Sequence, residues 1–232
     1  MDREKRMVEI SSQFTKTASE YDSWIRKVIP RYEEMLDTLV DSLPSMKHDG
    51  CQVIDLGCGT GSLSQKLLEA HPEVELICLD MASGMLDLAK ERLQEYPNID
   101  YVLSDLYDYE FGDNADLVIS SLALHHLVTD QDKKMIYRRI FDNLRPGGSF
   151  LNADIVLGSD QGMQGLYLQR WIEFMDRSLP KDEVADVIQR YHREDSPAKL
   201  YDHLRWLDDA GFRSVDTIWK HLNFAIYYGK KI

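Results

Sequence analysis

The stretch Val53-Ile-Asp-Leu-Gly-Cys-Gly-Thr-Gly-Ser62 decides the fold, because it joins an apolar strand to a glycine-rich turn and a helix. Its last residue is expected to cap a helix that carries Leu63, Leu67 and Leu68 on one face. The spacing is Gly-x-Gly-x-Gly, unlike the Gly-x-Gly-x-x-Gly of dinucleotide folds, and no Gly-Lys-Ser/Thr follows it. Asp55 lies inside the motif, where a carboxylate disfavours a phosphate and suits a cationic ligand.

This combination resembles the S-adenosylmethionine (SAM) site of the class I methyltransferases. In that family the acidic residue of the motif helps to hold the methionyl ammonium, and the glycines let the backbone approach the ligand. The resemblance covers residues 50–157 strongly and the two ends of the chain more loosely. It implies a cofactor site that includes Asp55, Gly57, Cys58, Gly59 and Gly61, with Cys58 acting through its backbone.

Further strands and helices alternate along the chain after this motif. Apolar segments predict strands that include Val53–Leu56, 74–80, 101–106, 115–121 and 150–156, with a closing antiparallel hairpin at 212–219 and 222–230. We therefore expect an α/β fold, namely a Rossmann-like doubly wound seven-stranded sheet with an antiparallel last strand, plus a helical cap.

Acidic and polar residues at the C-terminal ends of these strands are candidate cofactor ligands, because open α/β sheets bind ligands at that edge. Asp80 is expected to accept both hydroxyl hydrogens of a ribose, with Met81 packing on the adenine; the alternative is an exposed acid after a strand. The resemblance implies that Asp105 accepts from the adenine amino group and that the Leu106 amide binds a ring nitrogen. Ser121 is expected to lie nearest the cofactor.

His125 and His126 follow the fourth predicted strand and are the candidate catalytic residues. An imidazole near pKa 6.5 can act as a general base toward a substrate nucleophile at neutral pH. The alternative is a structural role in shaping the loop. No metal is expected, because the pair lacks a third ligand nearby in the sequence.

The N-terminal region is predicted to be helical, first over residues 4–20 and then through a second helix that includes Tyr32. The spacing from Phe14 to Tyr21 resembles the N-terminal lid of many small-molecule methyltransferases, which folds over the cofactor. The resemblance implies cofactor contacts from Tyr21 and Tyr32. The alternative is an ordinary amphipathic helix end, and Pro30 is expected to kink the second helix or mark its first turn.

Residues 159–195 read as an insertion of two helices broken at Pro180. An aromatic stripe on the first helix is expected to pack over the open end of the sheet, as core or as part of a substrate cap. Five residues of this insertion are candidate substrate contacts, with core packing or surface charge as the alternative: Tyr167, Arg170, Trp171, Tyr191 and His192.

These patterns divide the chain into four segments. Residues 1–48 are predicted to form an N-terminal helical lid, and 49–158 the SAM-binding α/β core. Residues 159–195 form the helical cap insertion, and 196–232 a C-terminal helix and β-hairpin that complete the core.

Composition limits the partners of the 232-residue chain. Its net charge is −13, so direct binding to a nucleic acid, which needs a basic face, is disfavoured. Three cysteines without Cys-x-x-Cys spacing indicate neither a disulfide framework nor a zinc site. The sequence shows no membrane span or signal peptide, so a cytoplasmic location is expected. The aromatic cap could equally form a homodimer interface.

The resemblance implies a SAM-dependent methyltransferase that acts on a small molecule by in-line displacement and releases S-adenosylhomocysteine. The chain ends are also similar to the carboxy-SAM synthases of tRNA wobble-uridine modification, through Ile29-Pro-Arg-Tyr32 and Ala210-Gly211-Phe212. That family holds its carboxylate with an arginine where this chain has Trp206, and it has an asparagine at the position of Ser121. A third alternative is a catalytically silent module that binds SAM or S-adenosylhomocysteine.

Overall fold

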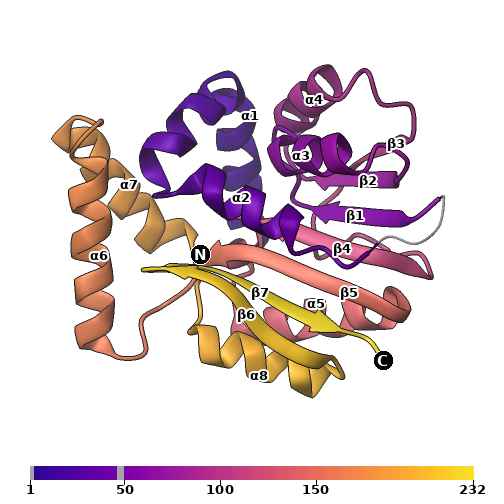
Figure 1. The fold of residues 1–232 in the computed structure, drawn as a ribbon. Coiled ribbons are helices and arrows are strands. Elements are labelled where there is room, and N and C mark those ends of the chain that lie inside the picture. The colour runs from indigo at the N-terminus through magenta and orange to yellow at the C-terminus, as the bar shows by residue number, and fades with distance from the viewer. Residues whose placement is uncertain (1–2, 46–49) are drawn as a thin grey trace.

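A computed structural model describes residues 3–45 and 50–232, and Figure 1 shows its ribbon. The central sheet has seven strands in the order β3-β2-β1-β4-β5-β7-β6. Strand β7 pairs antiparallel with both neighbours, and the other pairs are parallel. The predicted fold class is therefore confirmed. The strands are β1 (Gln52–Leu56), β2 (Glu75–Asp80), β3 (Ile99–Leu103), β4 (Ala115–Ser121), β5 (Leu144–Ile155), β6 (Arg213–His221) and β7 (Phe224–Lys230).

Helices cover both faces of the sheet, because successive strand residues point to opposite sides. Val53 packs in one apolar cluster with α2 (Tyr32–Asp41), α3 (Ser62–Ala70) and α4 (Ser83–Arg92). Its neighbour Ile54 packs in a second cluster with α5 (Asp130–Asn143) and α8 (Leu200–Ala210). Two cores of this kind are typical of a doubly wound α/β fold.

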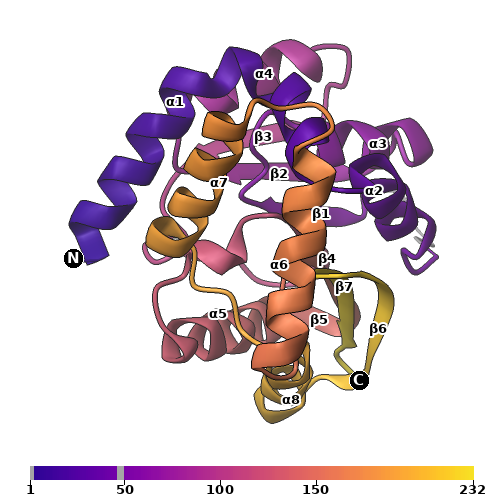
Figure 2. The same ribbon diagram turned by 90° about the vertical axis from the view of Figure 1, so that its left-hand side faces the viewer.

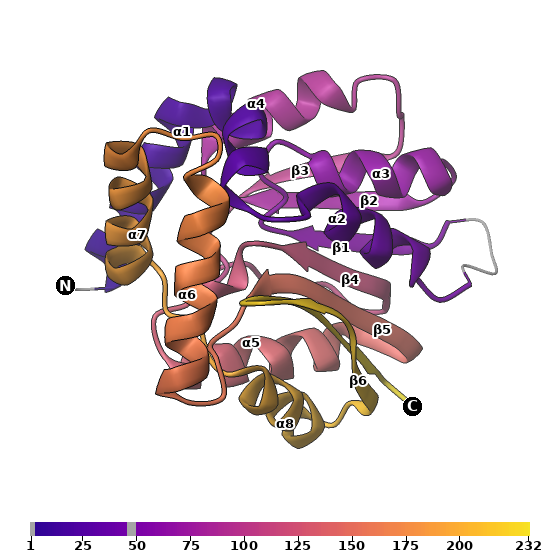
Figure 3. The ribbon, with the colours of Figure 1, turned by 60° about the vertical axis from the view of Figure 1, so that its left-hand side comes forward.

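Three further helices stand at the edge where the parallel strands end, as Figures 2 and 3 show. They are α1 (Arg3–Val28), α6 (Gln161–Met175) and α7 (Lys181–Glu194). The Trp171 indole on α6 donates a hydrogen bond to the Val28 carbonyl at the end of α1, over 2.7 Å. The N-terminal helix and the insertion thus contact each other above the sheet edge at which open α/β folds bind ligands.

The N-terminal helices divide at a different place from the one predicted. A single helix runs from Arg3 to Val28, without a break near residue 20, and α2 begins only at Tyr32. Pro30 lies between the two helices rather than inside the second, because proline has no N–H to donate and disfavours helical backbone in the residue before it. Arg31 then turns the chain with a positive φ of 59°.

The predicted helix cap at Ser62 is also wrong. Ser62 is the first residue of α3, and the cap position is occupied by Gly61, which provides no side-chain hydrogen bond. At Gly61 the turn itself sets the start of the helix, through a positive φ of 81°.

The predicted four-segment division remains a proposal, and its boundary at residue 48 lies outside the described residues. The two-helix insertion broken at Pro180 corresponds to α6 and α7. Within the ranges that the structure describes, no helix is both long and apolar enough to cross a membrane.

Candidate active site

A cavity of about 890 Å³ opens at the C-terminal ends of β1, β2 and β4, beneath α1. It is lined by eleven of the twelve residues predicted to bind a cofactor: Tyr21, Tyr32, Asp55, Gly57, Cys58, Gly59, Asp80, Met81, Asp105, Leu106 and Ser121. Gly61 does not line it. A Cβ at Gly61 would lie 3.3 Å from Ala89, so this glycine allows α3 to pack closely on α4. We refer to this cavity as the first cavity.

Asp55 is a fully buried carboxyl in the wall of the first cavity. Its Oδ2 accepts a hydrogen bond from the Ser64 hydroxyl over 2.6 Å. Among the described residues, no donor reaches its Oδ1. Burial raises the pKa of Asp55 to about 7, against the Ser64 hydrogen bond, which lowers it. An unpaired carboxylate oxygen of this kind is a ready partner for a cationic ligand.

The carboxylate of Asp80 ties the end of β2 to the glycine turn. Its Oδ2 accepts from the Gly59 amide over 2.9 Å, and its Oδ1 accepts from the Ala82 amide over 2.8 Å. Burial raises its pKa, whereas these backbone hydrogen bonds act in the opposite direction. Asp105 accepts from the Tyr107 amide over 3.0 Å, and burial raises its pKa also.

The glycine turn approaches the end of β2 closely. The amides of Gly57 and Cys58 both donate to the Leu79 carbonyl, over 2.8 and 2.9 Å. Gly57 has φ +71°, and a Cβ there would lie 2.3 Å from the Ala123 Cβ. Gly59 has φ +55° and has nothing within 4 Å of its own Cβ position, among the residues described. The absence of a side chain at Gly57 therefore lets the turn pack against Ala123, whereas the Cβ position of Gly59 faces open space.

Helix α1 is fixed over the first cavity by polar contacts. The Ser11 hydroxyl donates to the Met81 carbonyl over 2.8 Å. Asp22 accepts from Thr60 of the glycine turn over 2.6 Å and forms an ion pair with Arg92 of α4. Burial raises the pKa of Tyr21 well above its usual value, and Tyr21 lines the cavity from the same helix. These contacts attach α1 to the loops that line the first cavity.

A second cavity of about 1100 Å³ adjoins the first, and Phe14, Tyr21, Leu122 and His126 line both. Leu122 has a positive φ of 54°, a strained conformation for a leucine at the end of β4. Aromatic and apolar side chains from α1, α6 and α7 form much of the wall, with several charged groups between them. Two further residues that line this cavity, Trp24 and Arg190, were not predicted from the sequence. The guanidinium of Arg190 lies 5.0 Å from the centroid of the Trp24 indole ring.

Only two of the five predicted substrate contacts line the second cavity, namely Trp171 and Tyr191. The other three point elsewhere. The exposed Arg170 pairs with Glu173 over 2.7 Å, and the Tyr167 hydroxyl accepts from Lys220 over 3.2 Å. His192 is exposed on α7. Helical periodicity explains the positions of Arg170 and His192, because neighbouring residues of a helix lie about 100° apart around its axis.

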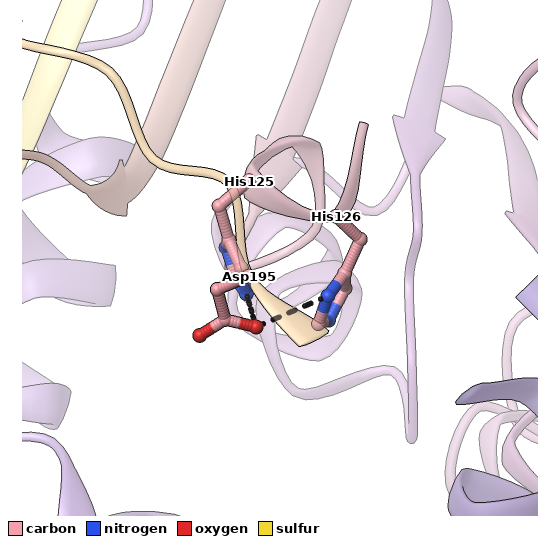
Figure 4. A group of neighbouring side chains, drawn as sticks. All are labelled: His125, His126 and Asp195. Carbon is pink, nitrogen blue, oxygen red and sulfur yellow. Dashed lines mark ion pairs between the residues drawn. The ribbon is translucent and has the colours of Figure 1, made fainter. Parts of the chain in front are cut away.

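The two histidines lie in the wall of the second cavity, on the short 3₁₀ helix Leu124–His126, and Figure 4 shows them facing Asp195. His125 Nδ1 lies 2.5 Å from Asp154 Oδ1, and His125 Nε2 lies 3.6 Å from Asp195 Oδ1. His126 Nδ1 lies 3.3 Å from the same Asp195 oxygen.

Neighbouring charges shift the pKa values of His125, Asp154 and Asp195. Burial alone would lower the pKa of His125, but Asp154 and Asp195 outweigh it and raise the pKa. Burial would likewise raise the pKa values of both aspartates, and the charge of His125 lowers them instead. A third possible metal ligand, which is not near the two histidines in the sequence, is brought to them by the fold, since the ligand atoms of His125, His126 and Asp195 lie within 4.8 Å of one another.

Residues 53–148 match the model of a family described as a methyltransferase domain. The carboxy-S-adenosyl-L-methionine synthase of Helicobacter hepaticus is 25% identical to this chain, and the match covers 96% of this chain and 97% of that protein.

Solved methyltransferases share the fold. An O-methyltransferase family 2 protein from Planctomyces limnophilus, in complex with apigenin, aligns with 100% of this chain at TM-score 0.65 and 20% identity. A phosphoethanolamine N-methyltransferase 2 from Haemonchus contortus, in complex with SAM, aligns with 86% at TM-score 0.63 and 16% identity. This chain spans 62% and 52% of those two chains, so the likeness concerns the fold alone.

The family match and the near full-length relative both point to a protein that uses SAM. The ligand cavity lies at the sheet edge where such a cofactor is expected. Residues 53–148 therefore match a methyltransferase domain, and the family match and the near full-length relative support an enzyme of the SAM-dependent methyltransferase type.

Proposed function

We propose that this enzyme binds SAM in the first cavity and transfers its methyl group to a small molecule in the second. The observation that carries the proposal is the junction of the two cavities, since Phe14, Tyr21, Leu122 and His126 line both. A cofactor and an acceptor could thus meet without leaving the protein. Aromatic walls in the second cavity favour an acceptor with an apolar or planar body.

The lining of the first cavity fits SAM. The unpaired Oδ1 of buried Asp55 supports a pairing with the methionyl ammonium, and the carboxylate of Asp80 at the end of β2 supports hydrogen bonds to a ribose. Asp105 and Leu106 line the cavity from the loop that follows β3, and they are proposed to contact the adenine. We propose these roles on the basis of position and available hydrogen-bonding capacity.

Bound SAM supplies an electrophilic methyl group, so the protein's main tasks are positioning and the exclusion of water. Helix α1 is proposed to exclude water from above, through the contacts of Ser11 and Asp22. His126 is proposed to contact the nucleophilic group of the acceptor, because it lines both cavities. His125 is proposed to hold the loop in place through Asp154. The general-base role of the pair stays a prediction.

A second candidate function is a carboxy-SAM synthase-like activity, and the relative of that name along nearly the whole chain favours it. The carboxylate-binding arginine that the resemblance implies corresponds here to Trp206, which is buried on α8 against His203. The neighbouring Arg205 is exposed and pairs with Asp202. Neither Trp206 nor Arg205 lines either cavity. We therefore prefer methyl transfer.

The mass of the nucleotide that co-purifies with the protein tests both functions. The nucleotide is released by denaturation, and the emptied enzyme is titrated with SAM and S-adenosylhomocysteine. SAM or S-adenosylhomocysteine would support methyl transfer and justify an acceptor screen. A mass one carboxylate heavier than SAM would overturn it in favour of the second candidate. Failure of both titrations would exclude the cofactor site itself.

A further inference from the structure

We propose that His125, His126 and Asp195 form a binding site for a divalent cation of the zinc class in the wall of the second cavity. The three residues come from two distant parts of the chain, the loop after β4 and the segment that follows α7. All three line the cavity, and Figure 4 shows the two imidazoles converging on one carboxylate oxygen. Two imidazoles and a carboxylate are a usual ligand set for zinc with an open position.

The distances from the two imidazoles to the shared carboxylate oxygen are close to those that a bound cation would impose. Zinc lies about 2.0–2.1 Å from its nitrogen and oxygen ligands in tetrahedral sites, which places two ligand atoms roughly 3.3–3.4 Å apart. Asp195 Oδ1 lies 3.3 Å from His126 Nδ1 and 3.6 Å from His125 Nε2. All three ligand atoms lie within 4.8 Å of one another, so the two imidazole nitrogens would have to close to the same spacing around a cation.

Asp154 supplies the outer contact that zinc-binding histidines normally have. It lies 2.5 Å from His125 Nδ1, and a proton on Nδ1 leaves the lone pair of Nε2 directed to the cluster. Asp154 and Asp195 together carry two negative charges, which a divalent cation would neutralise. The competing occupant is a proton, since protonated imidazoles could neutralise the same carboxylates.

The position of the cation site suggests a role in activating the acceptor. This role rests on the proposed methyl transfer. His126 lines both cavities, so a cation held by its Nδ1 would lie beside the junction of cofactor and acceptor. The fourth coordination position would open onto the second cavity. An acceptor hydroxyl bound there would become more acidic and lose its proton to solvent, because zinc strongly lowers the pKa of a bound hydroxyl. The site thus favours an oxygen nucleophile.

Metal binding is measured on the full chain after chelator treatment, by equilibrium dialysis against Zn²⁺ alone and mass-spectrometric counting of bound zinc. We expect one zinc per chain for the wild type. Asp195→Asn and His126→Gln should each weaken binding, and Asp154→Asn should weaken it about 10–100-fold by releasing His125. His192→Gln is the matched control, since His192 is exposed on the neighbouring helix and outside both cavities.

Cobalt provides a second readout, because Cys51, Cys58 and Cys78 are free thiols that could also bind zinc. A Co²⁺ complex of the proposed site should show the visible bands of nitrogen and oxygen ligands without a thiolate charge-transfer band. The proposal is overturned if folded wild type binds no stoichiometric zinc, if Asp195→Asn keeps wild-type affinity, or if the thiolate band appears. SAM titration does not depend on zinc, so failure here leaves the proposed function standing.

Discussion

Asp22 on helix α1 forms an ion pair with Arg92 at the end of α4, and the two side chains meet over the glycine turn. Arg92 also donates to Ser62 over 2.6 Å and to Thr60 over 3.1 Å. This network links the proposed lid to the loop that lines the first cavity. We infer that it holds α1 closed.

Replacement of Arg92 by methionine should therefore weaken SAM binding. The pair is partly exposed, so we expect a loss of about two- to tenfold in affinity, which corresponds to about 0.5–1.5 kcal/mol. Isothermal titration calorimetry measures the change. Lys90→Met on the same helix is the control, because Lys90 is exposed and its contacts, an ion pair with Asp87 and a position over the Tyr101 ring, lie away from the Asp22–Arg92 network. Equal affinities of the two variants would contradict the role of the network.

Asp55 should make SAM affinity depend on pH. Its pKa of about 7 means that the carboxyl becomes protonated, and loses its charge, as pH falls below 7. SAM affinity should then decrease by up to about tenfold per pH unit, since one proton must be released for each ligand bound. Calorimetry between pH 5.5 and 8.5 tests this, and Asp55→Asn should bind weakly with little pH dependence. A flat wild-type profile would exclude ionised Asp55 as the ammonium partner.

The raised pKa of Asp55 also makes the folding stability of the enzyme without SAM depend on pH. Stability falls as pH rises, whereas SAM affinity increases. Between the usual pKa of an aspartate and about 7, the folded state binds more protons at Asp55 than the unfolded state does. Its contribution to stability is thus greatest at low pH and is lost as pH rises through about 7. SAM should consequently stabilise the protein more at pH 8 than at pH 6, which thermal unfolding with and without SAM measures.

Asp80 tests the proposed ribose contact. Asp80→Ala should weaken SAM binding by about 1–3 kcal/mol through the loss of charge-assisted hydrogen bonds. It also removes the acceptors of the Gly59 and Ala82 amides, so thermal unfolding must show that the variant is folded. Asp100→Ala, an exposed acid on the adjacent strand β3, is the control. Unchanged calorimetric affinity in Asp80→Ala would reject the assignment.

The sequence predicted the sheet and the first cavity well, because both depend on short-range patterns. Strand β1, the glycine turn and α3 follow each other directly, and an acid at the end of a parallel strand such as Asp80 or Asp105 falls at the ligand-binding edge in any fold of this type. Eleven predicted residues therefore line one cavity.

The second cavity could not be predicted in the same way, because it depends on long-range packing. Asp195 meets His125 and His126 only after α6 and α7 have folded back over the sheet, and no local pattern signals that return. On α6 the sequence could not distinguish Trp171, which faces inward, from Arg170, which faces solvent. The side of each helix that faces the cavity is set by tertiary contacts.

Gly57 and Gly59 offer a matched pair that separates stability from cofactor binding. A Cβ at Gly57 would lie 2.3 Å from the Ala123 Cβ, so Gly57→Ala should lower the melting temperature sharply. Gly59 has a similar positive φ but open space around it, so Gly59→Ala should cost only about 1 kcal/mol of stability while its methyl group obstructs SAM. Thermal unfolding and calorimetry on both variants measure the two effects. If Gly59→Ala binds SAM normally, the ligand does not approach this turn closely.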